Sequence, residues 1–244
     1  MSIINEMLKK KTYKELDLNT HISLKNEYVF FQVSKVASST IKNFLQEIEV
    51  AGTSRKVIDV NNRYVSPHVW PTQLKEDKFI SIIESPSFKK ISFVRNPYSR
   101  VLSCYLHRII KDVNSPSNKS LAKYTGGLCG PKITFSDFVK VISEQEPKQQ
   151  ESHWRIQSEE IFFDVIPNWD FIGRFENLKN DLNILDSLLK LKNNNSSFDE
   201  SVNKSPMATG ANDKLKSYFD DNTQELIYNS YAADFINFNY GKEL

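Results

Sequence analysis

Residues 28–50 read YVFFQVSKVASSTIKNFLQEIEV, and this stretch decides the fold. The part from 28 to 33 is aromatic or β-branched except at Gln32, which predicts a short buried strand. The apolar side chains that follow recur at the spacing of one helix face and predict a helix over residues 38–50. A strand, a short loop and a helix in this order are the repeating unit of an α/β fold.

Similar strand-then-helix stretches recur downstream. Residues 90–94 predict a strand, and Pro97 then suits the first turn of a helix, where its missing N–H would be unpaired anyway. Residues 170–175 predict a strand that precedes a leucine-spaced helix, and residues 63–66 predict one more strand. We therefore expect an α/β fold of three layers, with helices on both faces of a central, mainly parallel sheet.

The remaining segments are assigned by composition and spacing. The polar stretches 112–132 and 145–152 are predicted to be exposed loops. The C-terminal third is helical by pattern, and its aromatic residues are expected in the core rather than at a sugar-binding surface: Tyr228, Tyr231, Phe235, Phe238 and Tyr240. We expect residues 1–26 to form an N-terminal extension and residues 27–244 to form a single domain.

Composition narrows the class of protein. The chain has 244 residues, with 32 Lys and Arg against 30 Asp and Glu, so its net charge is only +2. Proteins that coat nucleic acid need a large basic excess, so we expect no nucleic-acid partner. No window of about 18 residues is apolar enough for a membrane span, and residues 1–12 lack the apolar core of a secretory signal. With two cysteines, the sequence predicts no disulfide framework and a cytoplasmic location.

The loop between the first strand and its helix carries groups suited to an anion. Lys35 supplies an ammonium group, and Ser38, Ser39 and Thr40 supply hydroxyls where the helix begins. Backbone N–H groups and the positive end of the helix dipole point at the same place. The spacing of a Walker A motif is absent, so this is not a standard ATP loop. The alternative interpretation is a helix cap with a solvated lysine.

A second candidate site lies where a later strand ends. Residues 93–105 read FVRNPYSRVLSCY and place Arg95 at a strand's carboxyl end, where open α/β sheets bind ligands. Ser103 follows eight residues later, on the predicted helix. A guanidinium fork suits phosphate oxygens, so one phosphate could bridge Arg95 and Ser103. The alternative is that Arg95 and Arg100 form surface ion pairs.

Together these motifs resemble those of the sulfotransferases that use 3′-phosphoadenosine 5′-phosphosulfate (PAPS), and most resemble the Golgi carbohydrate sulfotransferases of the chondroitin and dermatan type. Residues 152–154 (SHW), 170–178 (DFIGRFENL) and 231–240 (YAADFINFNY) fit that family in the same order. The resemblance runs from about residue 28 to residue 240 and implies a fold like that of the P-loop NTPases. Because this chain lacks the membrane anchor and cysteines of the Golgi members, we expect a soluble, bacterial-type relative, in the cytoplasm or peripheral at the inner membrane.

The resemblance implies roles for individual residues. The first loop would hold the 5′-phosphosulfate through Lys35, Val36, Ala37, Ser38, Ser39 and Thr40. Lys35 would contact the bridging and leaving oxygens, and Arg95 with Ser103 would bind the 3′-phosphate that separates PAPS from ATP. The product would be adenosine 3′,5′-bisphosphate. No metal is implied, because the donor is already activated and the sequence shows no cluster of metal ligands.

The acceptor hydroxyl must lose a proton, and histidine suits that task near neutral pH. The candidates are His21, His68, His107 and His153. Position favours His68, because sulfotransferases commonly place the catalytic base after their second strand. His153 is the alternative base, or it shapes the acceptor pocket together with Trp154. A carboxylate such as Glu84 is a further alternative.

The expected acceptor is a hydroxyl of a carbohydrate: a polysaccharide, an oligosaccharide or a glycolipid. A protein tyrosine or a small alcohol is the alternative acceptor. Two other interpretations remain open from the residues alone, an atypical small-molecule kinase and a non-catalytic module that binds a glycan or a nucleotide. The acceptor's identity, its sulfated position and the oligomeric state have no signal in the sequence.

Overall fold

The computed structural model describes residues 2–190 and 209–244. The chain divides into two compact units. The first comprises Met1–Val94 and Ile161–Pro206, and the second comprises Arg95–Glu160 and Met207–Leu244. The chain thus leaves the first unit after residue 94, builds most of the second, and returns at residue 161.

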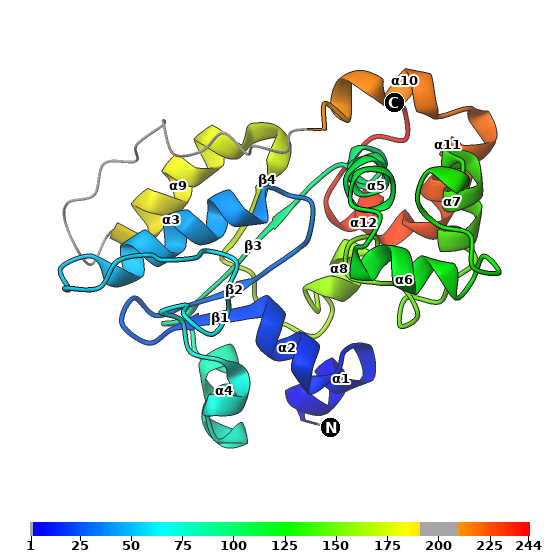
Figure 1. The fold of residues 1–244 in the computed structure, drawn as a ribbon. Coiled ribbons are helices and arrows are strands. Elements are labelled where there is room, and N and C mark those ends of the chain that lie inside the picture. Colours follow the sequence, from blue (N-terminus) through cyan, green and yellow to red (C-terminus); the bar gives the residue numbers. More distant parts are fainter. Residues whose placement is uncertain (1, 191–208) are drawn as a thin grey trace. The chain divides into compact units, whose positions relative to one another are not determined.

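The first unit contains a four-stranded sheet (Figure 1). Its strands, in spatial order, are β1 (Thr20–Ser23), β2 (Tyr28–Phe31), β3 (Lys89–Val94) and β4 (Phe171–Arg174). β1 and β2 pair antiparallel, whereas β2–β3 and β3–β4 pair parallel. The predicted mainly parallel sheet is therefore confirmed, and so are the strands expected near residues 28, 90 and 170.

Helices cover this sheet on both sides. α3 (Ser38–Val50) and α9 (Leu178–Lys190) lie on one side, and α4 (Glu76–Glu84) lies on the other (Figure 1). α3 has the bounds that the helical spacing predicts, because its apolar face packs on strands that are buried throughout: all four residues of β2 are at most 1% exposed. This α/β arrangement is the expected fold class, and it positions the loop between β2 and α3.

Residues 1–26 are not a separate extension. α1 (Ile3–Lys10) and α2 (Tyr13–Asn19) precede β1, and β1 is paired along its whole length with β2. The boundary expected after residue 26 therefore divides a hairpin. The reason is that β1, although it reads THIS, is buried at every position and forms the edge of the sheet.

The strand predicted at residues 63–66 is wrong, because this segment consists of turns. The Arg63 guanidinium, 6% exposed, donates hydrogen bonds to four backbone carbonyls of residues near β1. These acceptors are Asp17, Thr20, His68 and Val69. A side chain therefore holds the segment beside the sheet, and only Val69 forms an isolated bridge, to Ile22.

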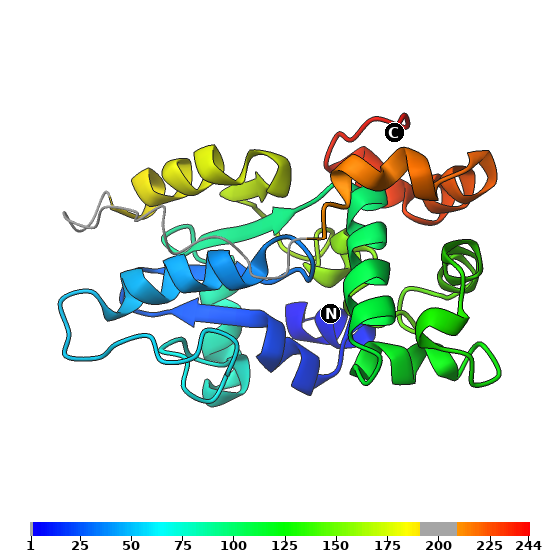
Figure 2. The same ribbon diagram turned by 45° about the horizontal axis from the view of Figure 1, so that its top comes forward.

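The second unit is helical. α5 (Pro97–Cys104) continues into a π-helix, η2 (Tyr105–Lys111), and Figure 2 shows the two as one continuous rod. The other helices of at least four residues are α6 (Pro116–Ala122), α7 (Phe135–Ser143), α8 (Gln157–Glu160), α10 (Leu215–Tyr218), α11 (Asp221–Ser230) and α12 (Ala232–Asn237). α11 packs against α5 and α7. No helix in the described parts of either unit is long and apolar enough to span a membrane.

Two expectations for the second unit have different outcomes. The C-terminal aromatic residues do belong to the core, since Tyr231, Phe235 and Phe238 are at most 5% exposed. Residues 112–132, by contrast, are not simply a loop, because they include α6. The buried Asn118 donates hydrogen bonds to carbonyls of η2 and accepts one from the N–H of residue 130, so a polar side chain folds this segment inward.

Candidate active site

The loop between β2 and α3 has an unusual backbone. Lys35 has φ +71° and Ala37 has φ +62°, a left-handed region that side-chain-bearing residues seldom adopt. Each such residue costs on the order of 1 kcal/mol and persists only where its surroundings enforce it. Val33 and Val36, both fully buried, anchor the loop on the core side. Turns of this kind gather backbone N–H groups into a concave anion-binding surface.

The amino end of α3 is suited to the same anion. Its N-cap residue, Ala37, makes no side-chain cap bond, and the first turn holds no acidic residue. The N–H groups of this turn therefore lack the usual side-chain acceptor, and the helix dipole is not offset there. Thr40 is 9% exposed and Ser39 is exposed at this end. Phosphate and sulfate oxygens match this set of donors.

A second lysine lies at this helix end that the sequence did not reveal. Lys42 Nζ and Ser39 Oγ each donate a 3.0 Å hydrogen bond to Asn61 Oδ1. Lys42 is 8% exposed, and burial, followed by the charge of Arg63, lowers its pKa to about 8. Lys42 falls outside the apolar stripe of α3, so no periodicity could have marked it as buried. The Lys42 ammonium and the Ser39 hydroxyl thus share one acceptor, Asn61 Oδ1, beside the loop.

The topology puts this loop at the ligand-binding edge of the sheet. β2 and β3 are parallel neighbours, with Phe31 opposite Ser92. The loop after β2 and the end of β3 at Val94 therefore lie at the same edge. This carboxyl edge is where α/β sheets bind their ligands.

In the second unit, Arg95 and Ser103 are both buried and hydrogen-bonded. Arg95, 5% exposed, donates from Nε to Ser99 Oγ and from Nη2 to Asn212 Oδ1, each over 2.8 Å. Ser103, 4% exposed, accepts from Thr209 Oγ1 at 3.4 Å. Thr209 thus contacts Ser103 and Asn212 contacts Arg95, and no motif pointed to either residue. The structure places Arg95 just before the N-cap of α5 and Ser103 in its last turn, on the second unit.

His68 lies in a buried network of the first unit. It is 3% exposed, its Nε2 lies 2.7 Å from Tyr28 Oη, and its Nδ1 lies 3.4 Å from Ser66 Oγ. Burial, and then the charge of Arg63, lowers the pKa of His68 to about 3. A general base needs access to its substrate and a pKa near the working pH. The base role of His68 stays a prediction, and its burial weighs against it.

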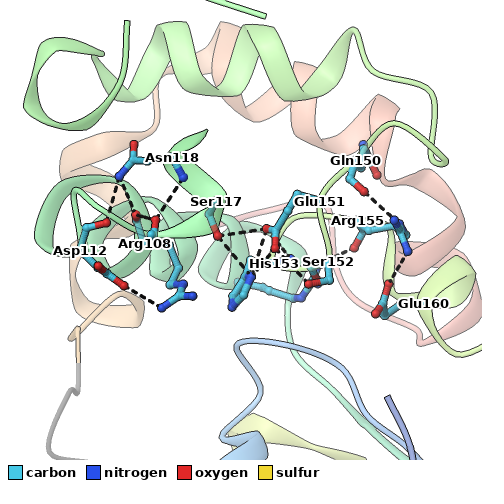
Figure 3. Close-up of polar contacts among 12 residues, drawn as sticks. Arg108, Asp112, Ser117, Asn118, Gln150, Glu151, Ser152, His153, Arg155 and Glu160 are labelled. Atoms are coloured by element: carbon cyan, nitrogen blue, oxygen red, sulfur yellow. Dashed lines mark hydrogen bonds and ion pairs between the residues drawn. The ribbon is translucent and has the colours of Figure 1, made fainter. Parts of the chain in front are cut away.

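His153, unlike His68, is partly exposed and is paired with a carboxylate, as Figure 3 shows for the pairing. Its Nδ1 lies 2.8 Å from Glu151 Oε1, and the side chains of His153 and Glu151 are 22% and 20% exposed. The Glu151 carboxylate also accepts hydrogen bonds from the hydroxyls of Ser117 and Ser152 and from the His153 backbone N–H. Burial raises the pKa of Glu151, but the hydrogen bonds and charge of His153 outweigh it and lower that pKa to about 2.

Trp154 is a core residue, contrary to the expected substrate contact. It has no exposed surface, its Nε1 donates to Gln145 Oε1 over 2.9 Å, and its carbonyl accepts from the Tyr231 hydroxyl. Its backbone N–H bonds the Glu151 carbonyl at 2.9 Å. Trp154 therefore anchors the turn that carries His153. Residues 2–190 and 209–244 hold no cluster of His, Cys, Asp and Glu that could bind a metal ion.

Comparison with known proteins identifies the family. Residues 19–241 match the sulfotransferase family. The chain belongs to this family. The motifs at residues 34–40, 95–103, 152–154 and 170–178 all lie inside the matched region of this sulfotransferase.

Two curated relatives carry more specific names. Human carbohydrate sulfotransferase 9 is 24% identical over 240 residues, covering 90% of this chain and 52% of the relative. Human carbohydrate sulfotransferase 8 is 22% identical over 236 residues, covering 89% of this chain and 54% of the relative. The chain thus spans about half the length of these relatives. No solved structure matches it.

Proposed function

We propose that this protein transfers a sulfuryl group from PAPS to a hydroxyl group of a carbohydrate. The observation that carries the proposal is the amino end of α3, which has no side-chain cap and follows a loop with two left-handed residues. Backbone N–H groups in such an arrangement can bind an anion. Family membership supports the reaction type. The names of the two human relatives support a carbohydrate, in a polysaccharide, an oligosaccharide or a glycolipid, as the acceptor.

Two sets of residues are proposed to bind the donor. The loop and first turn, Lys35 to Thr40, hold the 5′-phosphosulfate, with Lys42 as a further cation. Arg95 and Ser103 hold the 3′-phosphate, since a buried guanidinium and hydroxyl at one helix suit phosphate oxygens. The reaction needs no metal in this proposal, because PAPS supplies an activated sulfuryl group.

In the proposed mechanism, the acceptor oxygen attacks sulfur in line while the sulfur–oxygen bond to the phosphate breaks. Negative charge grows on the leaving oxygen, so the Lys35 ammonium, carried on a loop with a left-handed backbone, stabilises the transition state more than the ground state. A histidine accepts the acceptor's proton. We place this role on His153 rather than on His68, because the His153 side chain is partly exposed and His68 is buried.

The test of the donor is a comparison of two nucleotides. Adenosine 3′,5′-bisphosphate should raise the thermal unfolding midpoint, whereas ADP, which lacks the 3′-phosphate, should raise it far less. Equal shifts would contradict the assignment of Arg95 and Ser103. The acceptor is tested by transfer of labelled sulfate from PAPS to a panel of glycans and phenols. Transfer to phenols alone would replace the carbohydrate by a tyrosine-like acceptor.

The cellular setting is also a proposal. Cys104 and Cys129 form no disulfide within the described residues, which suits a reducing compartment, so we propose a bacterial-type protein of the cytoplasm, free or peripheral at the inner membrane. Cell fractionation with an antibody tests this location. Recovery from an oxidising compartment would contradict it.

A further inference from the structure

The pairing of Glu151 with His153 suggests a role for a residue that no motif includes. We infer that Glu151 is a positioning residue, which holds His153 as the Nδ1–H tautomer and leaves Nε2 as the proton acceptor for the acceptor hydroxyl. The inference deepens the proposed function and rests on it for the chemistry, although the tautomer itself can be measured without any reaction.

The tautomer follows from the hydrogen-bonding capacity of the two groups. Nδ1 of His153 lies 2.8 Å from Oε1 and 3.1 Å from Oε2 of Glu151. An ionised carboxylate only accepts hydrogen bonds, so Nδ1 must carry the proton in this contact. A neutral imidazole has one N–H, and Nε2 therefore keeps its lone pair.

The Nε2 atom is open to a substrate. No hydrogen-bond partner of Nε2 occurs among the described residues, and Nε2 is not among their buried unpaired atoms. The His153 side chain is 22% exposed, so solvent reaches it. In this inference, an acceptor hydroxyl approaches the ring from its exposed side. His21 and His68, at 2% and 3% exposure, do not have this property.

The surrounding contacts fix the carboxylate in place (Figure 3). Ser117 Oγ, from α6, donates to Glu151 Oε2 at 3.2 Å, and Ser152 Oγ donates to Oε1 at 3.1 Å. The His153 backbone N–H donates to Oε2 at 3.0 Å. With its oxygens held from several directions, Glu151 cannot rotate away from the imidazole without losing these bonds.

The turn that carries the pair is fixed as well. Arg100 of α5, fully buried, donates to the carbonyls of Ser152 and Arg155. Other charged groups of this unit near the pair are already paired with each other: Arg155 with Glu160, and Arg108 with Asp112. Among the described residues of this unit, Glu151 is the carboxylate that forms an ion pair with His153.

The arrangement has a chemical consequence. As the acceptor oxygen bonds to sulfur, its proton passes to Nε2, and the imidazole becomes a cation. The Glu151 carboxylate then faces that cation across Nδ1–H and stabilises it. Losing an orienting carboxylate in such a pair lowers turnover by about 10²- to 10⁴-fold without removing the base itself.

The experiment compares Glu151→Gln with Glu146→Gln. Residue 146 is an exposed carboxylate five positions earlier, so the control makes the same change of charge nearby. A glutamine amide can donate to Nδ1, which favours the Nε2–H tautomer. Nitrogen-15 NMR of the histidine rings should therefore show Nδ1–H for His153 in the wild type and in E146Q, and Nε2–H in E151Q.

Kinetics supply the second readout. We expect kcat to fall by about 10²-fold or more in E151Q, with donor binding unchanged and the acidic limb of the pH profile moved to lower pH. Glu151→Asp keeps the charge and should recover part of kcat, and it remains informative if E151Q does not fold. An Nε2–H tautomer in the wild type, or full turnover in E151Q, would overturn the inference. A wild type that transfers no sulfate would overturn the proposed function, while the NMR result would still decide the role of Glu151.

Discussion

The buried His68 leads to a quantitative prediction about stability. Its pKa is about 3 in the folded protein because of burial and of the nearby Arg63, against about 6.5 in an unfolded chain. At a pH between these two values, His68 is protonated in the unfolded chain but neutral in the folded protein. His68 therefore does not reduce the free energy of unfolding above pH 6.5. Below pH 6.5 that free energy falls as the pH drops toward 3.

The size of the effect follows from linkage. One proton changes the free energy of unfolding by about 1.4 kcal/mol per pH unit. At pH 5, about 1.5 units below the unfolded pKa, His68 alone should lower stability by about 2 kcal/mol relative to pH 7. His21, whose ring centroid is 5.6 Å from that of His68, also has a pKa well below its usual value through burial, and it adds in the same direction. Glu151, with its pKa at about 2, affects stability only below about pH 4.5.

Urea denaturation followed by circular dichroism at pH 7, 6 and 5 measures this loss. His68→Gln should lose about 2 kcal/mol less than the wild type between pH 7 and pH 5. Tyr28→Phe is the matched control, because it removes the partner 2.7 Å from Nε2 yet leaves His68 buried, so its pH dependence should stay like that of the wild type. An equal loss in the wild type and in His68→Gln would refute the reasoning.

Three further predictions follow from the site and the sheet. Lys35→Ala should lower kcat by about 10²-fold or more, because the positive charge near the leaving oxygen is lost. Lys78→Ala, at an exposed lysine of α4, is the control and should leave kcat unchanged. Steady-state sulfate transfer measures both variants. His153→Ala should lower kcat far more than His68→Gln does, and the reverse order in the same assay would return the base role to His68. Gly173→Ala should lower stability by about 1–3 kcal/mol, because its Cβ would lie 2.3 Å from the Phe93 ring; a thermal midpoint equal to that of the wild type would contradict this packing.

Local sequence predicted the elements in which the residue pattern itself indicates which side chains are buried. The aromatic run of β2 and the apolar stripe of α3 can each be recognised from the residues of the element alone. Both elements form where the sequence predicts them. The motifs, taken in their order along the chain, were enough to indicate the family. A local pattern could not reveal β1, because its four residues mix polar and apolar types and are all buried by pairing with β2.

The sequence by itself determined the α/β fold and the family, and it indicated the loop that we propose to bind an anion. Tertiary structure decided which of the candidate site residues are buried and which groups they contact. Sequence position favoured His68 as the base, but His68 is buried, and its pKa is lowered further by the charge of Arg63, which hydrogen-bonds a carbonyl 46 positions away. Glu151 had no motif, yet its pairing makes His153 the better candidate. The physical reason is that residue types and spacing define which groups are present, whereas exposure, pKa and hydrogen-bond partners depend on contacts between segments far apart in the chain.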